Sequence, residues 1–199
     1  MPFKLFLAAL FLVAAIPVQS QVVPAATEGG IPLEVGAGFS DYAVDWGPVR
    51  MQGGGIWIDY NFYRIPSFLR GIGVEAEAHD ISLARPSGMP SNFRQDTAGG
   101  GAIYTWRHYH NLHPYGKFIV GFGSIDFLGA FRDLPYYSHD TRTVYAPGGG
   151  VEYRVFRNIW VRGDYEYQMW PHIFQHAQTL DPVGFTIGAS YDFKHMHAH

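Results

Sequence analysis

The chain has 199 residues, of which 47% are hydrophobic, 17% aromatic and 16% charged. The charged fraction is below the roughly 25% usual for soluble domains, whereas glycine (24 residues) is abundant, which argues against a disordered chain, a coiled coil and a charge-covered helical bundle. The 14 basic and 17 acidic residues give a net charge of −3, so we expect no nucleic-acid partner. Cysteine is absent, which excludes disulfides, thiolate zinc sites and a cysteine nucleophile.

Residues 1–20 have the pattern of a secretory signal peptide. Lys4 supplies a positive charge, Leu5 to Ile16 is an apolar run, and Val18-Gln19-Ser20 places compact residues before the expected cut. The apolar run is shorter than the ~20 residues that a membrane-spanning helix needs. We therefore expect a cleaved signal peptide, followed by a short N-terminal segment over 21–30.

From residue 33 onward the dominant hydrophobic period is two, which is typical of strands with two different faces. Eight segments alternate in this way, and we predict that they are strands. They are Leu33–Ser40, Ile56–Phe62, Ile72–His79, Ala102–Arg107, Lys117–Gly123, Val151–Val155, Ile159–Gln168 and Gly184–Phe193. The absence of 18 consecutive apolar residues after Ser20 excludes a bundle of transmembrane helices, but it does not exclude a membrane barrel, whose strands alternate.

Three glycine triplets precede even-numbered segments, and the connections between segments differ in length. The triplets, at 53–55, 99–101 and 148–150, are interpreted as bends near the outer rim of a small barrel. Outer-membrane barrels have long cell-surface loops and short periplasmic turns, so the N-terminus is expected on the periplasmic side. The long connections are expected at 41–50, 82–97, 127–143 and 169–181, and the short ones at 63–70, 108–115 and 156–158.

The two faces of the segments indicate what each side meets. The apolar face carries more aromatic rings than the interior of an eight-stranded barrel can hold, so we expect it to face lipid. The opposite face mixes small residues with charges and suits a narrow lumen. Its charged residues are Glu34, Asp59, Glu75, Glu77, Arg107, Lys117, Glu152, Arg154, Arg162, Asp164, Glu166 and Asp192. Because an unpaired buried charge costs several kcal/mol, we expect a paired ladder in the lumen, with Glu152 opposite Arg162. The acids outnumber the bases, so some acids must lie near the rims, be hydrated or bind protons.

The last segment ends in Gly188-Ala189-Ser190-Tyr191-Asp192-Phe193, which resembles the assembly signal of bacterial outer-membrane barrels, with Gly188, Tyr191 and Phe193 as its characteristic residues. Arg162-Gly163-Asp164-Tyr165-Glu166-Tyr167 and Pro114-Tyr115-Gly116-Lys117 also resemble the small outer-membrane protein A-like barrel family. The resemblance covers about 31–193, before a His-rich tail at 194–199. It implies a Gram-negative outer membrane, insertion by the barrel assembly machinery and lipopolysaccharide as a neighbour. We expect no peptidoglycan-binding domain.

Histidines recur in a predicted turn, in a predicted loop and in the tail. Neutral imidazoles at these spacings can bind Zn²⁺ or Ni²⁺, but no acidic or cysteine ligand is fixed beside them. They are His108, His110 and His113; His172 and His176; and His195, His197 and His199. Ser138-His139-Asp140 has the residue types of a hydrolase triad, but consecutive side chains point in different directions. We therefore predict no catalytic residue, no cofactor and no metal site.

These patterns together predict an all-β fold, a monomeric eight-stranded antiparallel up-and-down transmembrane β-barrel over 31–193. The expected role is structural, in envelope integrity or in surface recognition. Two alternatives remain. A small-solute channel would require the inward-facing glycines to leave a continuous water path, and an enzyme that modifies lipid A would require catalytic groups that the motifs do not supply.

Overall fold

The structure, a computed structural model, describes residues 31–44, 49–62, 65–66, 69–83, 94–126, 139–173 and 178–193. The expected signal peptide, the segment that follows it and the His-rich tail all lie outside these ranges. Within the described part of the chain, no helix combines the length and the apolar character needed to cross a membrane.

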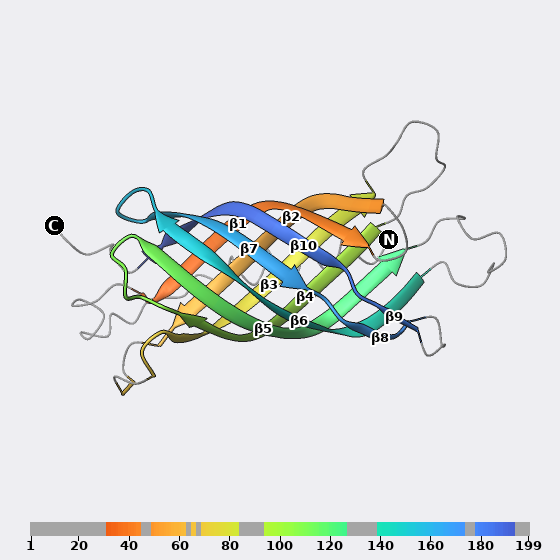
Figure 1. The fold of residues 1–199 in the computed structure, drawn as a ribbon, viewed down its shortest axis with the longest axis horizontal. Helices are drawn as coiled ribbons and strands as arrows, with labels where there is room; N and C mark the ends of the chain where they lie inside the picture. Colours follow the sequence, from red (N-terminus) through yellow and green to blue (C-terminus); the bar gives the residue numbers. More distant parts are fainter. Residues whose placement is uncertain are drawn as a thin grey trace, which may run out of the picture.

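Eight antiparallel strands close into a barrel, which confirms the predicted fold class (Figure 1). Each barrel strand pairs with the next one along the chain, and the last pairs with the first. The barrel strands are β1 (Leu33–Val44), β2 (Val49–Asn61), β3 (Ile72–Leu83), β4 (Arg94–Thr105), β5 (Leu112–Asp126), β6 (His139–Arg154), β7 (Ile159–Tyr167) and β10 (Val183–Asp192). Two short strands, β8 (Trp170–Ile173) and β9 (Gln178–Leu180), form a separate hairpin between β7 and β10.

The barrel has two different ends. At the end on the left of Figure 1, here the terminus end, β1 begins, β10 ends and the connections β2–β3, β4–β5 and β6–β7 lie. At the other end, here the loop end, strands β1, β3 and β5 end, strands β2, β4 and β6 begin, and the β8–β9 hairpin lies.

Two expectations about the connections are wrong. β1 continues to Val44 and β2 begins at Val49, so four residues connect them in place of the long loop expected at 41–50. Pairing continues there because side chains such as Tyr42 are buried inside the barrel. The loop expected at 169–181 contains β8 and β9. Loop lengths therefore do not alternate as strictly as predicted.

The glycine triplets do not lie near the outer rim, and none of them begins a strand. Each lies within its strand, and Gly53–Gly55 pair with Gly38–Ser40 of β1 and with His79–Ile81 of β3. The backbones come very close at these places. A Cβ atom on Gly101 would lie 1.9 Å from the carbonyl oxygen of Phe118. The triplets therefore permit close packing in the middle of the barrel wall.

The outward orientation of the apolar face is confirmed. Tyr104, Tyr153 and Ile187 are 47%, 53% and 56% exposed on the outer surface. The register places aromatic rings at strand ends, because Tyr104 pairs with the first residue of β3 and Tyr153 with the first residue of β5. Such rings at the terminus end match the aromatic girdle that flanks the lipid-facing band of an outer-membrane barrel.

A cluster of buried apolar side chains closes the loop end of the barrel, and we call it the loop-end cap. Strands β1, β2, β3, β5 and β6 and the β8–β9 hairpin supply its side chains. Its members are Tyr42, Val44, Met51, Ile81, Ile125, Val144, Trp170, Ile173 and Leu180. The three from the hairpin are fully buried, so this hairpin folds its apolar side chains over the end of the lumen.

Candidate functional site

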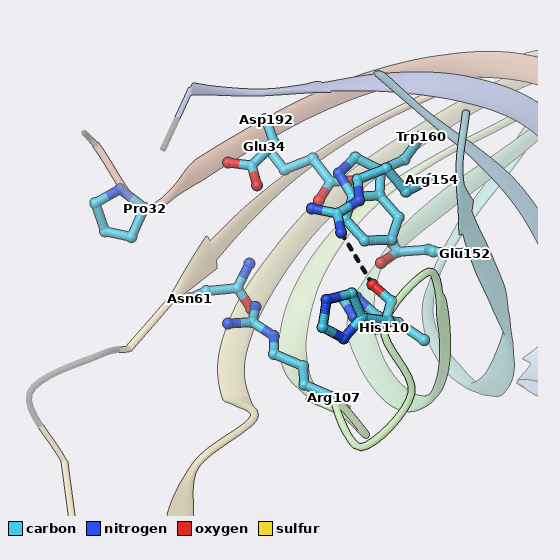
Figure 2. Close-up of a pocket in the computed structure, with 10 residues that line it drawn as sticks. Pro32, Glu34, Asn61, Arg107, His110, Glu152, Arg154, Trp160 and Asp192 are labelled. Atoms are coloured by element: carbon cyan, nitrogen blue, oxygen red, sulfur yellow. Dashed lines mark hydrogen bonds between the residues drawn. The ribbon is translucent and has the colours of Figure 1, made fainter. Parts of the chain in front are cut away.

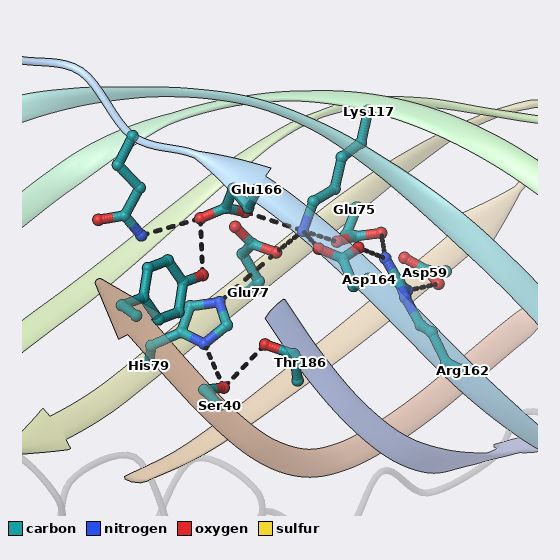
Figure 3. Close-up of polar contacts among 12 residues, drawn as sticks. Ser40, Asp59, Glu75, Glu77, His79, Lys117, Arg162, Asp164, Glu166 and Thr186 are labelled. Carbon is teal, nitrogen blue, oxygen red and sulfur yellow. Dashed lines mark hydrogen bonds and ion pairs between the residues drawn. The ribbon is translucent and has the colours of Figure 1, made fainter. Parts of the chain in front are cut away.

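The middle of the lumen holds an ion-pair network whose first centre is Arg162 of β7 (Figure 3). Its Nη1 lies 3.0 Å from Oδ2 of Asp59, and its Nη2 lies 2.7 Å from Oε2 of Glu75 and 3.3 Å from Oδ2 of Asp164. Its Nε donates a 2.7 Å hydrogen bond to the hydroxyl of Tyr115, which in turn donates to Asp164. One guanidinium therefore links strands β2, β3, β5 and β7.

Aromatic rings enclose this guanidinium. Its carbon lies 5.0 Å from the ring of Trp57 and 4.4 Å from the ring of Tyr115. The Arg162 side chain is only 2% exposed. Charge-assisted hydrogen bonds strengthen when water is excluded, and a cation over an aromatic face gains further attraction. Because it is buried between these rings and carboxylates, Arg162 holds the surrounding strands together across the lumen.

Lys117 of β5 is the second centre of the network. Its Nζ lies 2.5 Å from Glu77, 2.9 Å from Glu166, 3.2 Å from Asp164 and 3.4 Å from Glu75. The Lys117 side chain is 2% exposed. Glu75 and Asp164 also contact Arg162, so the two cations share carboxylates and form one connected group.

The network differs from a ladder between adjacent strands. The expected pairing of Glu152 with Arg162 across β6 and β7 is confirmed in the register, but their nearest side-chain atoms are 3.8 Å apart. The shorter contacts of Arg162 are to β2 and β3, across the lumen. The reason is geometric, since the lumen of an eight-stranded barrel is narrow enough for long side chains to reach the opposite wall.

At the terminus end the lumen widens into a polar pocket of about 180 Å³, the terminus pocket (Figure 2). It is lined by Pro32, Glu34, Asn61, Arg107, His110, His113, Glu152, Arg154, Trp160 and Asp192. Arg107 follows the end of β4 and is exposed, so it lines the mouth of the lumen beyond the last strand pairs. Arg154 donates to the carbonyl of His110 and to Oδ1 of Asn111, both at 3.1 Å.

Aromatic rings fill the space that the inward-facing glycines leave. A Cβ atom on Gly36 would lie 2.2 Å from the ring of Trp57, and one on Gly123 would lie 2.1 Å from the ring of Trp170. Two further cavities along the described lumen have volumes of about 10 Å³ each. This is about the space of one water molecule. The glycines therefore accommodate interior rings in the described barrel.

Polar side chains connect the network to the loop-end cap. Gln168 donates a 2.8 Å hydrogen bond to Glu166 and accepts hydrogen bonds from Gln95 at 2.9 Å and from the indole of Trp170 at 3.1 Å. Gln95, Gln168 and Trp170 belong to no sequence motif that marks them as part of a site. Gln95 precedes the segment predicted as a strand, and Trp170 lies in a segment predicted as a loop. Burial was the missing information.

The histidines have different surroundings. His113 lies in the terminus pocket, its ring 4.5 Å from that of Trp160. His139 is exposed at the loop end, and its Nδ1 lies 2.6 Å from Oδ1 of Asp126, a residue outside the predicted Ser138-His139-Asp140 set. Ser138, His176 and the tail histidines lie outside the described residues.

The sequence of residues 6–193 matches the model of the family described as the outer membrane protein beta-barrel domain. The chain belongs to this family. It is therefore an outer-membrane β-barrel protein, and the lipid of that membrane surrounds its exposed apolar face. Among curated proteins, no match is found.

Two solved bacterial proteins illustrate the structures of similar fold. Neisserial surface protein A is 16% identical, with a TM-score of 0.60 over 81% of this chain and 96% of that one. Ail, the attachment invasion locus protein of Yersinia pestis, in complex with the heparin analogue sucrose octasulfate, is 18% identical, with a TM-score of 0.54 over 83% of this chain and 99% of that one. At these identities the similarity establishes a shared barrel fold.

Proposed function

We propose that this protein is a closed outer-membrane barrel with a structural or surface-recognition role, and neither a solute channel nor an enzyme. The observation that carries the proposal is the filled lumen. The loop-end cap and the network around Arg162 and Lys117 occupy it, and the rings of Trp57 and Trp170 fill the space beside its glycines. A fixed ion-pair network across the lumen suits a rigid scaffold, because moving it would separate buried charges.

The rim of the loop end supports a role at the membrane surface. Charged pairs follow it just beyond the apolar band, as Arg50–Asp41 at 2.8 Å, Arg94–Asp80 at 2.8 Å and Arg142–Asp140 at 3.1 Å. Long connections belong on the cell surface of such barrels and short turns on the periplasmic side. The loop end would then face outward, where lipopolysaccharide is the neighbour and its charged groups meet this rim. The mature chain would follow a signal cleaved after Ser20, begin with a periplasmic segment over 21–30 and act as a monomer.

Electrical conductance of the purified protein in planar bilayers tests the closed-barrel proposal. Because the cavities between the interior groups are about the size of one water molecule, we expect no stable unitary current. A known pore-forming barrel inserted under the same conditions is the control. Stable unitary currents from the folded protein would establish the channel alternative instead.

The enzyme alternative has its own test. Overproduction of the protein is expected to leave the mass spectrum of lipid A unchanged. The group under test is the hydroxyl of Thr141, which lies 3.1 Å from Nε2 of His139. An altered acyl chain or phosphate on lipid A, lost on substitution of His139, would overturn this part of the proposal.

We further propose that the end of β10 and the residue after it form the signal read by the barrel assembly machinery, with Gly188, Tyr191 and Phe193 as its residues. The rings of Tyr191 and Phe193 meet edge to face, 4.9 Å apart. Phe193→Ala is expected to reduce the yield of assembled barrel in cells, measured by the mobility shift between boiled and unboiled samples. Phe156→Ala, at an exposed ring of the β6–β7 turn, is the control. Equal yields of the two variants would contradict the assignment.

A further inference from the structure

Three potential metal ligands meet in the lumen between Lys117 and the loop-end cap (Figure 3). They are Glu77 and His79 of β3 and Glu166 of β7, and one ligand atom from each lies within 4.8 Å of the others. Their side chains are 7%, 5% and 1% exposed. The cluster is therefore part of the protein interior and not of the solvated surface.

The imidazole of His79 has one ring nitrogen that makes a hydrogen bond and one that makes none. Its Nδ1 lies 3.1 Å from the hydroxyl of Ser40, and that hydroxyl lies 2.8 Å from the hydroxyl of Thr186. The other ring nitrogen, Nε2, is buried without a hydrogen-bond partner and lies 3.8 Å from Oε2 of Glu77. A hydrogen bond from Nδ1–H to Ser40 would leave a lone pair on Nε2. Metal-binding histidines are commonly held in this way.

The carboxylate of Glu166 is also held in place. Its Oε1 accepts hydrogen bonds from the hydroxyl of Tyr42 at 3.0 Å and from Nε2 of Gln168 at 2.8 Å. These donors fix the plane of the carboxylate and direct Oε2 toward Lys117, 2.9 Å away. Two of the three potential ligands thus have outer partners that set their orientation.

The surrounding charge favours a further cation. Six carboxylates lie within 3.8 Å of the two buried cations Lys117 and Arg162, namely Asp59, Glu75, Glu77, Glu152, Asp164 and Glu166. Burying carboxylates without counterions costs several kcal/mol each, so additional positive charge would stabilise the barrel.

We propose that Glu77, His79 and Glu166 form a binding site for a divalent metal ion of the Zn²⁺ class. Zn²⁺ takes histidine nitrogen and carboxylate oxygen at about 2.0–2.2 Å in a tetrahedral arrangement. Ligand atoms then stand about 3.4 Å apart, close to the 3.8 Å between Nε2 of His79 and Oε2 of Glu77. A cavity of about 10 Å³ borders Glu77, His79 and Thr186 and leaves room for a water as the fourth ligand.

The ammonium group of Lys117 competes with this metal ion for two of its ligands. It contacts Glu77 and Glu166, and on metal binding it would retain Asp164 at 3.2 Å and Glu75 at 3.4 Å. The metal ion would thus relieve the carboxylate excess without leaving the ammonium unpaired. It would also join β3 to β7 across the lumen, as Arg162 does one level away.

Zinc content of the purified full-length chain tests the proposal. The parent for this experiment carries His195→Asn, His197→Asn and His199→Asn, so that the tail binds no metal. After equilibration with Zn²⁺ and dialysis, we expect about one bound ion per folded barrel and a raised unfolding temperature. His79→Asn should lose both, whereas His172→Asn, at an exposed position with a φ of 58° that asparagine tolerates, should keep both.

Two further variants separate metal binding from a general role in folding. Ser40→Ala, which keeps all three ligands, should weaken zinc affinity about tenfold by releasing the imidazole. Lys117→Met should bind Zn²⁺ more tightly than the parent, because the competing ammonium is gone. All variants are compared as folded, heat-modifiable barrels. Failure of the folded parent to bind zinc, or unchanged zinc binding by folded His79→Asn, would overturn the proposal.

Discussion

Arg162→Met is expected to lower the free energy of unfolding of the barrel by about 3–5 kcal/mol. The substitution keeps most of the side-chain volume but removes the charge that contacts Asp59, Glu75 and Asp164. These carboxylates are buried, so they cannot recover their hydration without opening the barrel. Urea titration of the protein refolded into lipid vesicles, followed by tryptophan fluorescence, measures the loss.

The matched control for this prediction is Arg50→Met. Arg50 also forms an ion pair, 2.8 Å from Asp41, but half of its side chain is exposed at the loop end. A pair of that kind contributes at most about 1 kcal/mol. Adding Glu75→Gln to Arg162→Met should recover part of the lost stability, because it removes one buried carboxylate whose guanidinium partner is gone. If the free energy of unfolding fell by the same small amount in both arginine variants, Arg162 would not stabilise the barrel across its lumen.

Trp170→Ala is expected to destabilise the barrel by about 3–5 kcal/mol, the range for removing a large buried aromatic side chain. Trp170 is fully buried in the loop-end cap, where its ring lies against Gly123 and its indole donates to Gln168. The truncation leaves a cavity over a glycine, which has no side chain to move into it. Thermal unfolding monitored by gel mobility measures the effect.

Trp106→Ala is the control for this second prediction. Trp106 is 59% exposed on the outer surface beyond the end of β4, so its removal creates no interior cavity. We expect a smaller change for Trp106→Ala, from lost contact with lipid alone. A Trp170→Ala barrel as stable as the Trp106→Ala barrel would show that the β8–β9 hairpin is not part of the folded core.

The strand faces could be predicted from the sequence because a period of two is a local property. Val120 and Phe122 alternate with Ile119 and Gly123, and a shift by one residue would place charges such as Arg162 in lipid. The pairing of Glu152 with Arg162 also followed from sequence, since a short turn fixes the register on both sides of it.

Contacts across the lumen could not be predicted in this way. Arg162 reaches Asp59 and Glu75 because the closed barrel brings β7 opposite β2 and β3, and no local pattern records that distance. The loop-end cap was missed for a related reason. Trp170, Ile173 and Leu180 do not follow the two-residue period of a strand. They are buried because the β8–β9 hairpin places them over the end of the lumen.

Apolar side chains of the barrel face lipid while the charged network fills the lumen, and labels on adjacent residues of one strand distinguish these two sides. The chain has no cysteine, so single cysteines at the adjacent positions Ile119 and Val120 of β5 can each carry a spin label. In lipid vesicles, the label at position 120 should collide frequently with oxygen dissolved in the bilayer, and the label at position 119 should be protected from it. The reverse pattern, or equal collision rates at the two positions, would show that the apolar face of the strands does not meet lipid.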